Sequence, residues 1–209
     1  MVNYMAIDCE MVETIGVRNS LARVSIVDHQ SNVLLDEFVI PPGGCVVDYR
    51  TRYSGITKQI IDQKGQDMSV ALERVKKVLK NAVVIGHTVN TDLDSLRECP
   101  CRAIVDISEN SMLKLLYWRT VNTEDPDTDE EIIRRPRVSL KKLSTTLLDR
   151  KIQQGKKGHS SVEDAQATMD LFKVIQKRWE ETNPDLAGDN LFNDRYWDEE
   201  ESLSTDDED

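Results

Sequence analysis

Two carboxylates interrupt an apolar run near the start of the chain. Asp8 and Glu10 lie within residues 4–12, whose sequence is YMAIDCEMV. If this run is a buried strand, its side chains alternate, so Asp8 and Glu10 share one face while Ile7, Cys9 and Met11 take the other. Ionised carboxylates beside an apolar core are costly unless a cation compensates them, and a divalent metal would do so. The alternative is that both acids mark a strand end facing water, and their spacing alone does not decide.

A third and a fourth carboxylate occupy places where separate elements can converge on the first pair. Residues 91–94, TDLD, resemble a helix start and follow the short apolar run 82–85 and Gly86. Asp92 is thus expected in a first helical turn at the carboxyl end of a strand, where ligand sites of open α/β sheets lie. Residues 160–163, SSVE, predict a capping box at the start of a helix that runs through Trp179, and Asp164 lies in the first part of that helix.

A histidine precedes the fourth acid by five residues. Five residues at about 100° each place His159 and Asp164 roughly 140° apart on a helix, so the two cannot share one face. His159 is therefore assigned to the loop before the helix, where it can serve as a general base beside a metal cluster. The alternative is an ordinary solvent-exposed loop residue.

The elements that must position these residues begin with strands and continue as alternating helices and strands. Residues 4–12, 21–27 and 32–40 predict three strands joined by short turns, which favours an antiparallel meander. A helix over 67–81 with Asp67 or Ser69 as its cap, a strand over 82–85 and a strand over 103–107 follow. Asp106 is expected as a cap or strand-end acid. Further helices are predicted over 111–119 and 140–148, and the fold class is α/β.

Length and charge divide the chain into a body and a tail. The 209 residues fit one domain with an appendage, which we place at 1–182 and 183–209. The net charge is −11, but residues 184–209 hold eleven acids and one arginine, so the body is close to neutral. A polyanionic substrate is therefore compatible with the body. The tail has few apolar residues and is predicted to be disordered or loosely packed, and residues 123–131, with six acids, are predicted to be a solvated insertion.

Neither a membrane span nor a secretory leader is readable in the sequence. We therefore expect an intracellular protein without a membrane partner. The sequence does not distinguish a nuclear or nucleolar compartment from a cytoplasmic one. The four cysteines are scattered, which argues against a disulfide framework, and Cys99 and Cys101 lack the second cysteine pair of a zinc site.

The three acidic segments resemble the sequence motifs of a known family, the 3′→5′ exonucleases of the DEDDh type within the ribonuclease H-like superfamily. Residues 6–12 resemble its first motif, residues 85–93 its second and residues 158–165 its third. Residues 20–23 and 48–52 are similar to the subgroup that contains the interferon-stimulated exonuclease and the apoptosis-enhancing nuclease. The resemblance extends from about residue 4 to about residue 178, and the acidic insertion and tail depart from it.

This resemblance implies a mixed five-stranded sheet, made of the three-strand meander and two parallel strands, flanked by helices. It also implies two Mg²⁺ or Mn²⁺ ions and the release of nucleoside 5′-monophosphates from single-stranded nucleic acid, with RNA favoured over DNA. The implied metal ligands are Asp8, Glu10, Asp92 and Asp164. His159 would deprotonate the attacking water.

Two further residues are expected to contact substrate. Met11 would lie against the terminal sugar and Arg50 would reach a phosphate or a ribose hydroxyl, whereas Met11 in the core and Arg50 on the surface are the alternatives. His87, within the second motif, is expected to support the strand end. The rival functions are a catalytically silent nucleic-acid-binding or scaffold protein and a metal-dependent hydrolase of small phosphoesters. Protein partners are not predicted by any motif.

Overall fold

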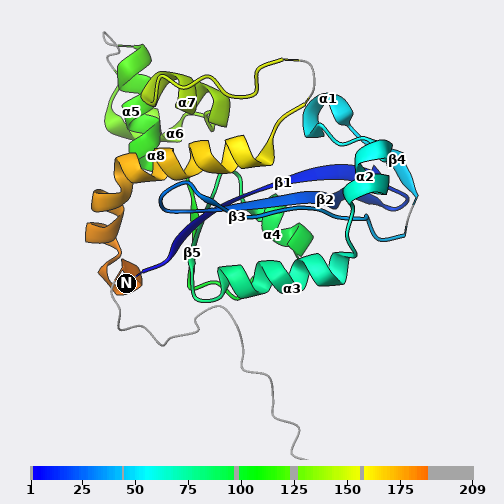
Figure 1. Ribbon diagram of the computed structural model, residues 1–209. Helices are drawn as coiled ribbons and strands as arrows, with labels where there is room; N and C mark the ends of the chain where they lie inside the picture. The colour runs from blue at the N-terminus through cyan, green and yellow to red at the C-terminus, as the bar shows by residue number, and fades with distance from the viewer. Residues whose placement is uncertain (1, 44, 97–98, 123–126, 156–157, 188–209) are drawn as a thin grey trace, which may run out of the picture.

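A computed structural model describes residues 2–43, 45–96, 99–122, 127–155 and 158–187 (Figure 1). The elements follow one another along the chain as β1 (Tyr4–Thr14), β2 (Val17–Asp28), β3 (Val33–Phe38), β4 (Val46–Asp48), α1 (Thr51–Ser54), α2 (Lys58–Lys64), α3 (Met68–Leu79), β5 (Val83–Gly86), α4 (Asn90–Leu96), β6 (Ala103–Asp106), α5 (Ser111–Val121), α6 (Asp129–Arg134), α7 (Leu140–Leu147), α8 (Ser161–Thr182) and α9 (Pro184–Ala187).

The sheet is mixed, as predicted, with strand order β3-β2-β1-β5-β6. The antiparallel meander β1-β2-β3 and the parallel pairs β1-β5 and β5-β6 confirm the predicted arrangement. The prediction of five strands was short by one, because β4 pairs with Glu13 and Thr14 at the end of β1. Three residues are too few to show alternation in the sequence, and their pairing depends on where the chain returns after β3.

The strand β1 separates two apolar cores, one on each face of the sheet. Tyr4 and Ala6 point toward α8 and pack in one cluster with Phe172, while Ile7 points to the opposite face and packs with Val75 of α3. Figure 1 shows α8 crossing one face while α3 and α4 lie on the other. The predicted alternation along β1 is thereby confirmed.

One edge of β1 is left without a strand partner in its middle. The strand pairs with β2 along residues 5–14, but with β5 only at residues 4–6 and with β4 only at residues 13 and 14. Backbone N–H groups on this edge between the two short pairings need other acceptors, since buried donors are rarely left unpaired. The acids of β1 lie in this interval.

The acidic segment 123–131 differs in part from its prediction. Residues 123–126 lie outside the described residues, but residues 129–131 begin α6 and do not form a loop. Thr128 and Glu131 make a reciprocal capping box, and the buried Ile132 anchors the helix. The TDEE sequence is itself a helix-start pattern, which the local excess of acids concealed.

A short helix follows α8, and the domain boundary expected at residue 182 stays a prediction. The helix α9 follows, and its Leu186 packs against the cluster that contains Phe172. The prediction of disorder for the rest of the acidic tail falls on residues 188–209, outside the described residues. Within the described part of the chain, none of the helices combines the length and the apolar composition needed to span a membrane.

Candidate active site

The acids of β1 face the first turn of α8, on the side of the sheet that the alternation predicts. Glu10 is 7% exposed and Asp164 of α8 is 3% exposed. Negative charge on Asp164 disfavours ionisation of both Asp8 and Glu10, so the three carboxyl groups interact. The expectation that strand and helix bring these acids together is met.

Asp92 joins them from α4 through the open edge of β1. Its Oδ1 accepts a hydrogen bond of 3.1 Å from the backbone N–H of Cys9, which lies between Asp8 and Glu10. This bond satisfies a strand donor that neither β5 nor β4 reaches. The first turn of α4 thus places the buried Asp92 beside the β1 acids, where the sequence predicted it.

The loop before α4 is held by Asp106 at the end of β6. The carboxylate of Asp106 accepts hydrogen bonds from the backbone N–H groups of Thr88 at 2.9 Å, Val89 at 3.2 Å and Ser108 at 2.9 Å. The prediction that Asp106 is a cap or strand-end acid is confirmed, since it ends β6 and binds these N–H groups. Because these bonds fix the turn between β5 and α4, they fix the direction from which Asp92 approaches.

The start of α8 is anchored by contacts that replace the predicted capping box. The Ser160 side chain makes no capping bond, so the capping prediction was wrong. Instead, the buried hydroxyls of Ser161 and Ser25 lie 2.6 Å apart, and Glu163 Oε2 accepts the Gln153 N–H at 2.9 Å. Helix position is therefore set by β2 and by the preceding loop, neither of which local sequence reveals.

His159 belongs to the loop before α8, as predicted. Its Nδ1 lies 3.8 Å from Oδ2 of Asp164, and its side chain is 38% exposed. Its backbone N–H donates a hydrogen bond of 2.6 Å to the carbonyl of Tyr53, the third residue of α1. The imidazole is thus adjacent to the acids and open to solvent.

All four carboxyl groups are held less acidic than usual. Burial raises the pKa of Glu10 to about 8, with a further contribution from Asp164. Burial also raises the pKa of Asp92 to about 7, although the Cys9 hydrogen bonds oppose the change. The pKa values of Asp8 and Asp164 are raised by burial too, and for Asp8 the charges of the other three acids add to the effect.

Among the described residues, little positive charge balances the acids of β1. Arg23, opposite Glu10 in the β1-β2 register, lowers the pKa of Asp8 and Glu10, but its guanidinium is bound by Asp36 at 2.7 and 3.0 Å. Ionising each further carboxyl group of the site without a bound cation therefore costs free energy.

The donor set fits a divalent cation. Among the described residues, Glu10 Oε1 and Asp164 Oδ1 are buried with no hydrogen-bond partner, and buried oxygens are rarely left so. Carboxylate oxygens are the ligands that Mg²⁺ and Mn²⁺ favour. No group of three or more His, Cys, Asp or Glu side chains in the described chain is already arranged to hold an ion. One oxygen of Asp92 is bound by the Cys9 N–H and one oxygen of Asp164 by the Gln153 side chain.

Comparison with known proteins identifies the family to which the chain belongs. The profile of a protein family described as Exonuclease matches residues 5–172, which include all four acids and His159. The chain belongs to this exonuclease family. Its exonuclease domain is 41% identical over 180 residues to interferon-stimulated 20 kDa exonuclease-like 2 of Bos taurus, covering 85% of this chain and 47% of the relative. It is 36% identical over 218 residues to apoptosis-enhancing nuclease of Rattus norvegicus, covering 97% of this chain and 61% of the relative. The chain thus spans about half the length of these relatives.

The fold of the exonuclease domain is similar to solved structures. The Saccharomyces cerevisiae Pan2 pseudoubiquitin hydrolase-RNA exonuclease module, solved with A7 RNA, aligns with a TM-score of 0.61 at 23% identity, over 88% of this chain and 30% of that chain. The predicted ribonuclease H-like α/β class is confirmed. Divalent metal ions are general for this family, in agreement with the unpaired carboxylate oxygens.

The two residues predicted to contact substrate lie in different surroundings. Met11 of the exonuclease domain is partly exposed and packs against the cluster on the α3 face, and its contact with substrate stays a prediction. Arg50 precedes α1 with φ of 48°, and its guanidinium donates to Glu13 Oε2 at 2.9 Å and Asn19 Oδ1 at 3.1 Å. Its contact with substrate stays a prediction.

The structure adds residues that the sequence analysis missed and places one that it predicted. Gln153 donates to Asp164 Oδ2 at 3.0 Å, and no motif surrounds it that would have identified it. Arg23 was noted only within the similarity of residues 20–23, with no role assigned. His87 contacts the carbonyl of Val138 through Nε2 at 2.9 Å, consistent with the structural role expected of it.

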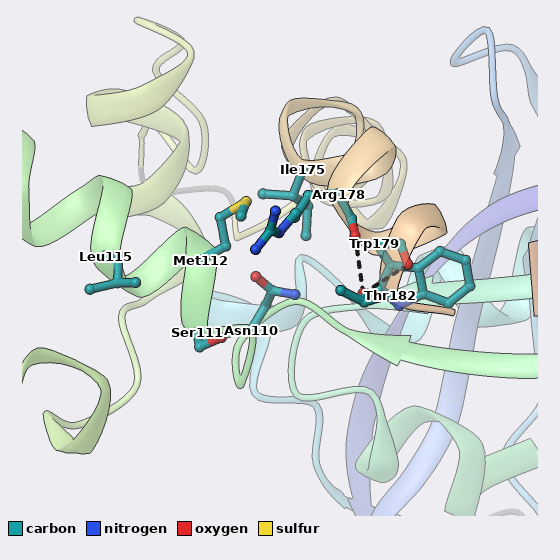
Figure 2. A pocket seen from close by; sticks show the side chains of 8 residues that line it. All are labelled: Asn110, Ser111, Met112, Leu115, Ile175, Arg178, Trp179 and Thr182. Carbon is teal, nitrogen blue, oxygen red and sulfur yellow. Dashed lines mark hydrogen bonds between the residues drawn. The ribbon is translucent and has the colours of Figure 1, made fainter. Parts of the chain in front are cut away.

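A separate groove lies between α5 and α8, far from the acids. Figure 2 shows Trp179 and Arg178 of α8 and Met112 of α5 lining it, and its volume is about 310 Å³. Since a helix rises about 1.5 Å per residue, Ile175 to Thr182 lie roughly 17–27 Å along α8 from Asp164. The groove is therefore no part of the acidic site.

Proposed function

We propose that this protein is a metal-dependent 3′→5′ exonuclease that hydrolyses single-stranded nucleic acid, RNA in preference to DNA, to nucleoside 5′-monophosphates. The observation that carries the proposal is the convergence of four carboxylates from β1, α4 and α8, with Glu10, Asp92 and Asp164 buried, Asp8 partly buried, and unpaired oxygens on Glu10 and Asp164. The names of the relatives and the RNA in the Pan2 structure support the reaction class and the substrate class.

Asp8, Glu10, Asp92 and Asp164 are proposed to hold two Mg²⁺ or Mn²⁺ ions. A two-metal site stabilises both the attacking and the leaving oxygen of an in-line displacement at phosphorus. The raised pKa values of the acids mean that ion binding must be accompanied by proton release. The same acids repel a polyanionic substrate when the ions are absent, so substrate binding should also require metal.

His159 is proposed to take the proton from the attacking water. Its Nδ1 side faces Asp164 at 3.8 Å, which can orient the ring and stabilise the imidazolium that forms, and Nε2 is then the nitrogen to accept the proton. Partial exposure of the ring allows the proton to leave to solvent. Asp92 is buried, unlike His159, and this burial suits the role of a metal ligand.

Arg50 and Met11 are proposed to contact the 3′ nucleotide, Arg50 through a phosphate or the ribose 2′-hydroxyl that distinguishes RNA from DNA. We propose an intracellular setting, and the free state of all four cysteines, each in the described part of the chain, agrees with a reducing compartment.

The deciding experiment compares matched single-stranded RNA and DNA carrying a 5′ label, the same strands with a blocked 3′ end, and a small phosphodiester, each with and without Mn²⁺. Stepwise shortening from a free 3′ end, dependent on metal and lost in Asp92→Asn, is expected. Cleavage of the small ester alone would favour the small-phosphoester hydrolase. Strand binding without cleavage at any metal concentration would favour the silent nucleic-acid-binding protein.

A further inference from the structure

The loop that carries His159 rests directly on the backbone of α1. A Cβ atom added to Gly158 would lie 2.1 Å from the nitrogen and 2.4 Å from the Cα of Gly55, and 2.7 Å from the carbonyl oxygen of Thr51. All three are backbone atoms, which cannot rotate away. Next to this contact, the N–H of His159 donates to the carbonyl of Tyr53 at 2.6 Å.

The part of α1 under this loop is braced from within. The buried Ser54 donates through Oγ to the carbonyl of Tyr49 at 2.7 Å and accepts the N–H of Ile56 at 3.0 Å. Ile56 is 1% exposed and packs in the cluster formed with Val12 of β1. A helix of only four residues has little stability of its own, so these contacts hold the surface on which the loop lies.

Gly158 meets two separate requirements at this position. Its φ of 87° is in the region that residues with a Cβ rarely adopt, and the space beside it is closed by Gly55. Either requirement alone favours glycine, but only the second depends on α1.

We infer that α1 is the element that positions the catalytic base, and that Gly158 is a positioning residue whose lack of a side chain lets His159 seat against Gly55 and Tyr53. This inference rests on the proposed function of His159. Because adjacent Cα atoms are 3.8 Å apart, we expect lifting residue 158 off α1 to displace the imidazole relative to Asp164.

The test uses a second glycine of the same loop as a matched control. Gly155 also has positive φ, at 103°, but a Cβ there would meet no atom within 4 Å. Gly155→Ala therefore adds backbone strain without a steric contact, and Gly158→Ala adds both. A displacement near 1 Å at a catalytic group costs about 10²-fold in rate, so Gly158→Ala should lower kcat about 10–100-fold with little change in KM for a 3′-labelled RNA strand. Gly155→Ala should stay within about 3-fold of wild type.

A double-mutant cycle separates positioning from general damage. If Gly158 acts through the imidazole, adding Gly158→Ala to His159→Ala should cause no further loss of kcat. Equal kcat for the two alanine variants of the glycines, or a Gly158→Ala loss that persists in full without the imidazole, would overturn the inference. A wild-type rate for His159→Ala would instead refute the proposed base itself.

A second variant covers the case in which Gly158→Ala does not fold. Ser54→Ala removes both hydrogen bonds that brace α1 and leaves the glycine contact in place. It should lower kcat about 3–10-fold, again only when His159 is present, because a looser support holds the base less well. An effect on thermal stability with unchanged kcat would show that α1 does not position the base.

Discussion

Two features of Asp92 have opposite effects on the pKa of its carboxyl group. It accepts the Cys9 N–H, which favours its charged form, yet its burial raises its pKa to about 7. A neutral amide at this place could keep the shape and the buried position while removing one of four repelling charges.

We therefore expect Asp92→Asn to abolish hydrolysis while leaving the metal-free protein as stable as wild type or more so, because like-charge repulsion is relieved. Activity with saturating Mn²⁺ and the thermal unfolding midpoint without metal would be measured on the same preparation. A folded Asp92→Asn protein with wild-type turnover would remove Asp92 from the metal site.

His159→Ala is expected to lower turnover by roughly 10²–10⁴-fold, the usual contribution of a positioned acid–base group, while Mn²⁺ affinity changes little. Calorimetric Mn²⁺ titration beside single-turnover cleavage would test both parts. His29, whose Nε2 lies 2.7 Å from Gln176 Oε1, provides the control, and His29→Ala should retain the rate. Loss of metal affinity in His159→Ala would identify it as a ligand and not a base.

Among the elements, the turn between β5 and α4 depends on an acid of the neighbouring strand. Asp106 accepts three backbone N–H groups and the Ser108 hydroxyl, which lies 2.7 Å from its Oδ1. Hydrogen bonds to a charged group contribute more than neutral ones, and removing the acceptor leaves partly buried donors unpaired.

Asp106→Ala should lower the free energy of unfolding by about 2–3 kcal/mol and also reduce turnover, because the turn that aims Asp92 is released. Denaturant unfolding and the cleavage rate at a temperature where the variant is folded would be compared. Asp28→Ala is the matched control, since Asp28 accepts the N–H groups of Gln30 and Asn32 in the turn after β2. It should lose stability without losing rate, and equal rate losses in both variants would contradict the role of Asp106.

For the whole molecule, the acidic site makes folding depend on pH. Glu10, with a pKa of about 8, and Asp92, with a pKa of about 7, bind protons in the folded state over a range where the unfolded chain has lost them. The folded state thus binds more protons between about pH 4 and pH 8, and the stability of the metal-free protein falls as pH rises through that range.

We expect the thermal midpoint of Glu10→Gln to exceed that of wild type by a margin that grows from pH 5 to pH 8, because the glutamine cannot acquire the unfavourable charge. Saturating Mn²⁺ should stabilise wild type most at the upper end of the range. Parallel midpoint curves for the two proteins would show that the Glu10 carboxyl is not perturbed in this way.

Residues 188–209 add a strong negative charge to the molecule, since they contain ten acids and one arginine. Deleting them should tighten binding of single-stranded RNA, most clearly at low salt, since a local negative segment repels a polyanion. A chain of equal length with the acids replaced by Asn and Gln should bind like the deletion if charge is the cause. Unchanged affinity at low ionic strength would assign the segment another role.

The sequence by itself determined the main sheet, the helices α3, α5, α7 and α8 and the candidate acids, because each depends on local patterns. Alternation along residues 4–12 placed Asp8 and Glu10 on one face, and the angle between His159 and Asp164 put the histidine in a loop. The cap residue Asp67 was readable for the same reason, since its side chain accepts the Ser69 N–H two residues away.

Only the tertiary structure decided contacts between segments far apart in the chain. Four such contacts join residues that no local pattern links. They are the pairing of β4 with β1, the hydrogen bond from Cys9 to Asp92, the hydrogen bond from Gln153 to Asp164 and the contact of Gly158 with Gly55. The capping box expected at Ser160 failed for the same physical reason. Contacts from outside the helix fix the start of α8 in place of a Ser160 cap. These are the buried hydroxyl pair of Ser161 and Ser25 and the hydrogen bond from the Gln153 N–H to Glu163.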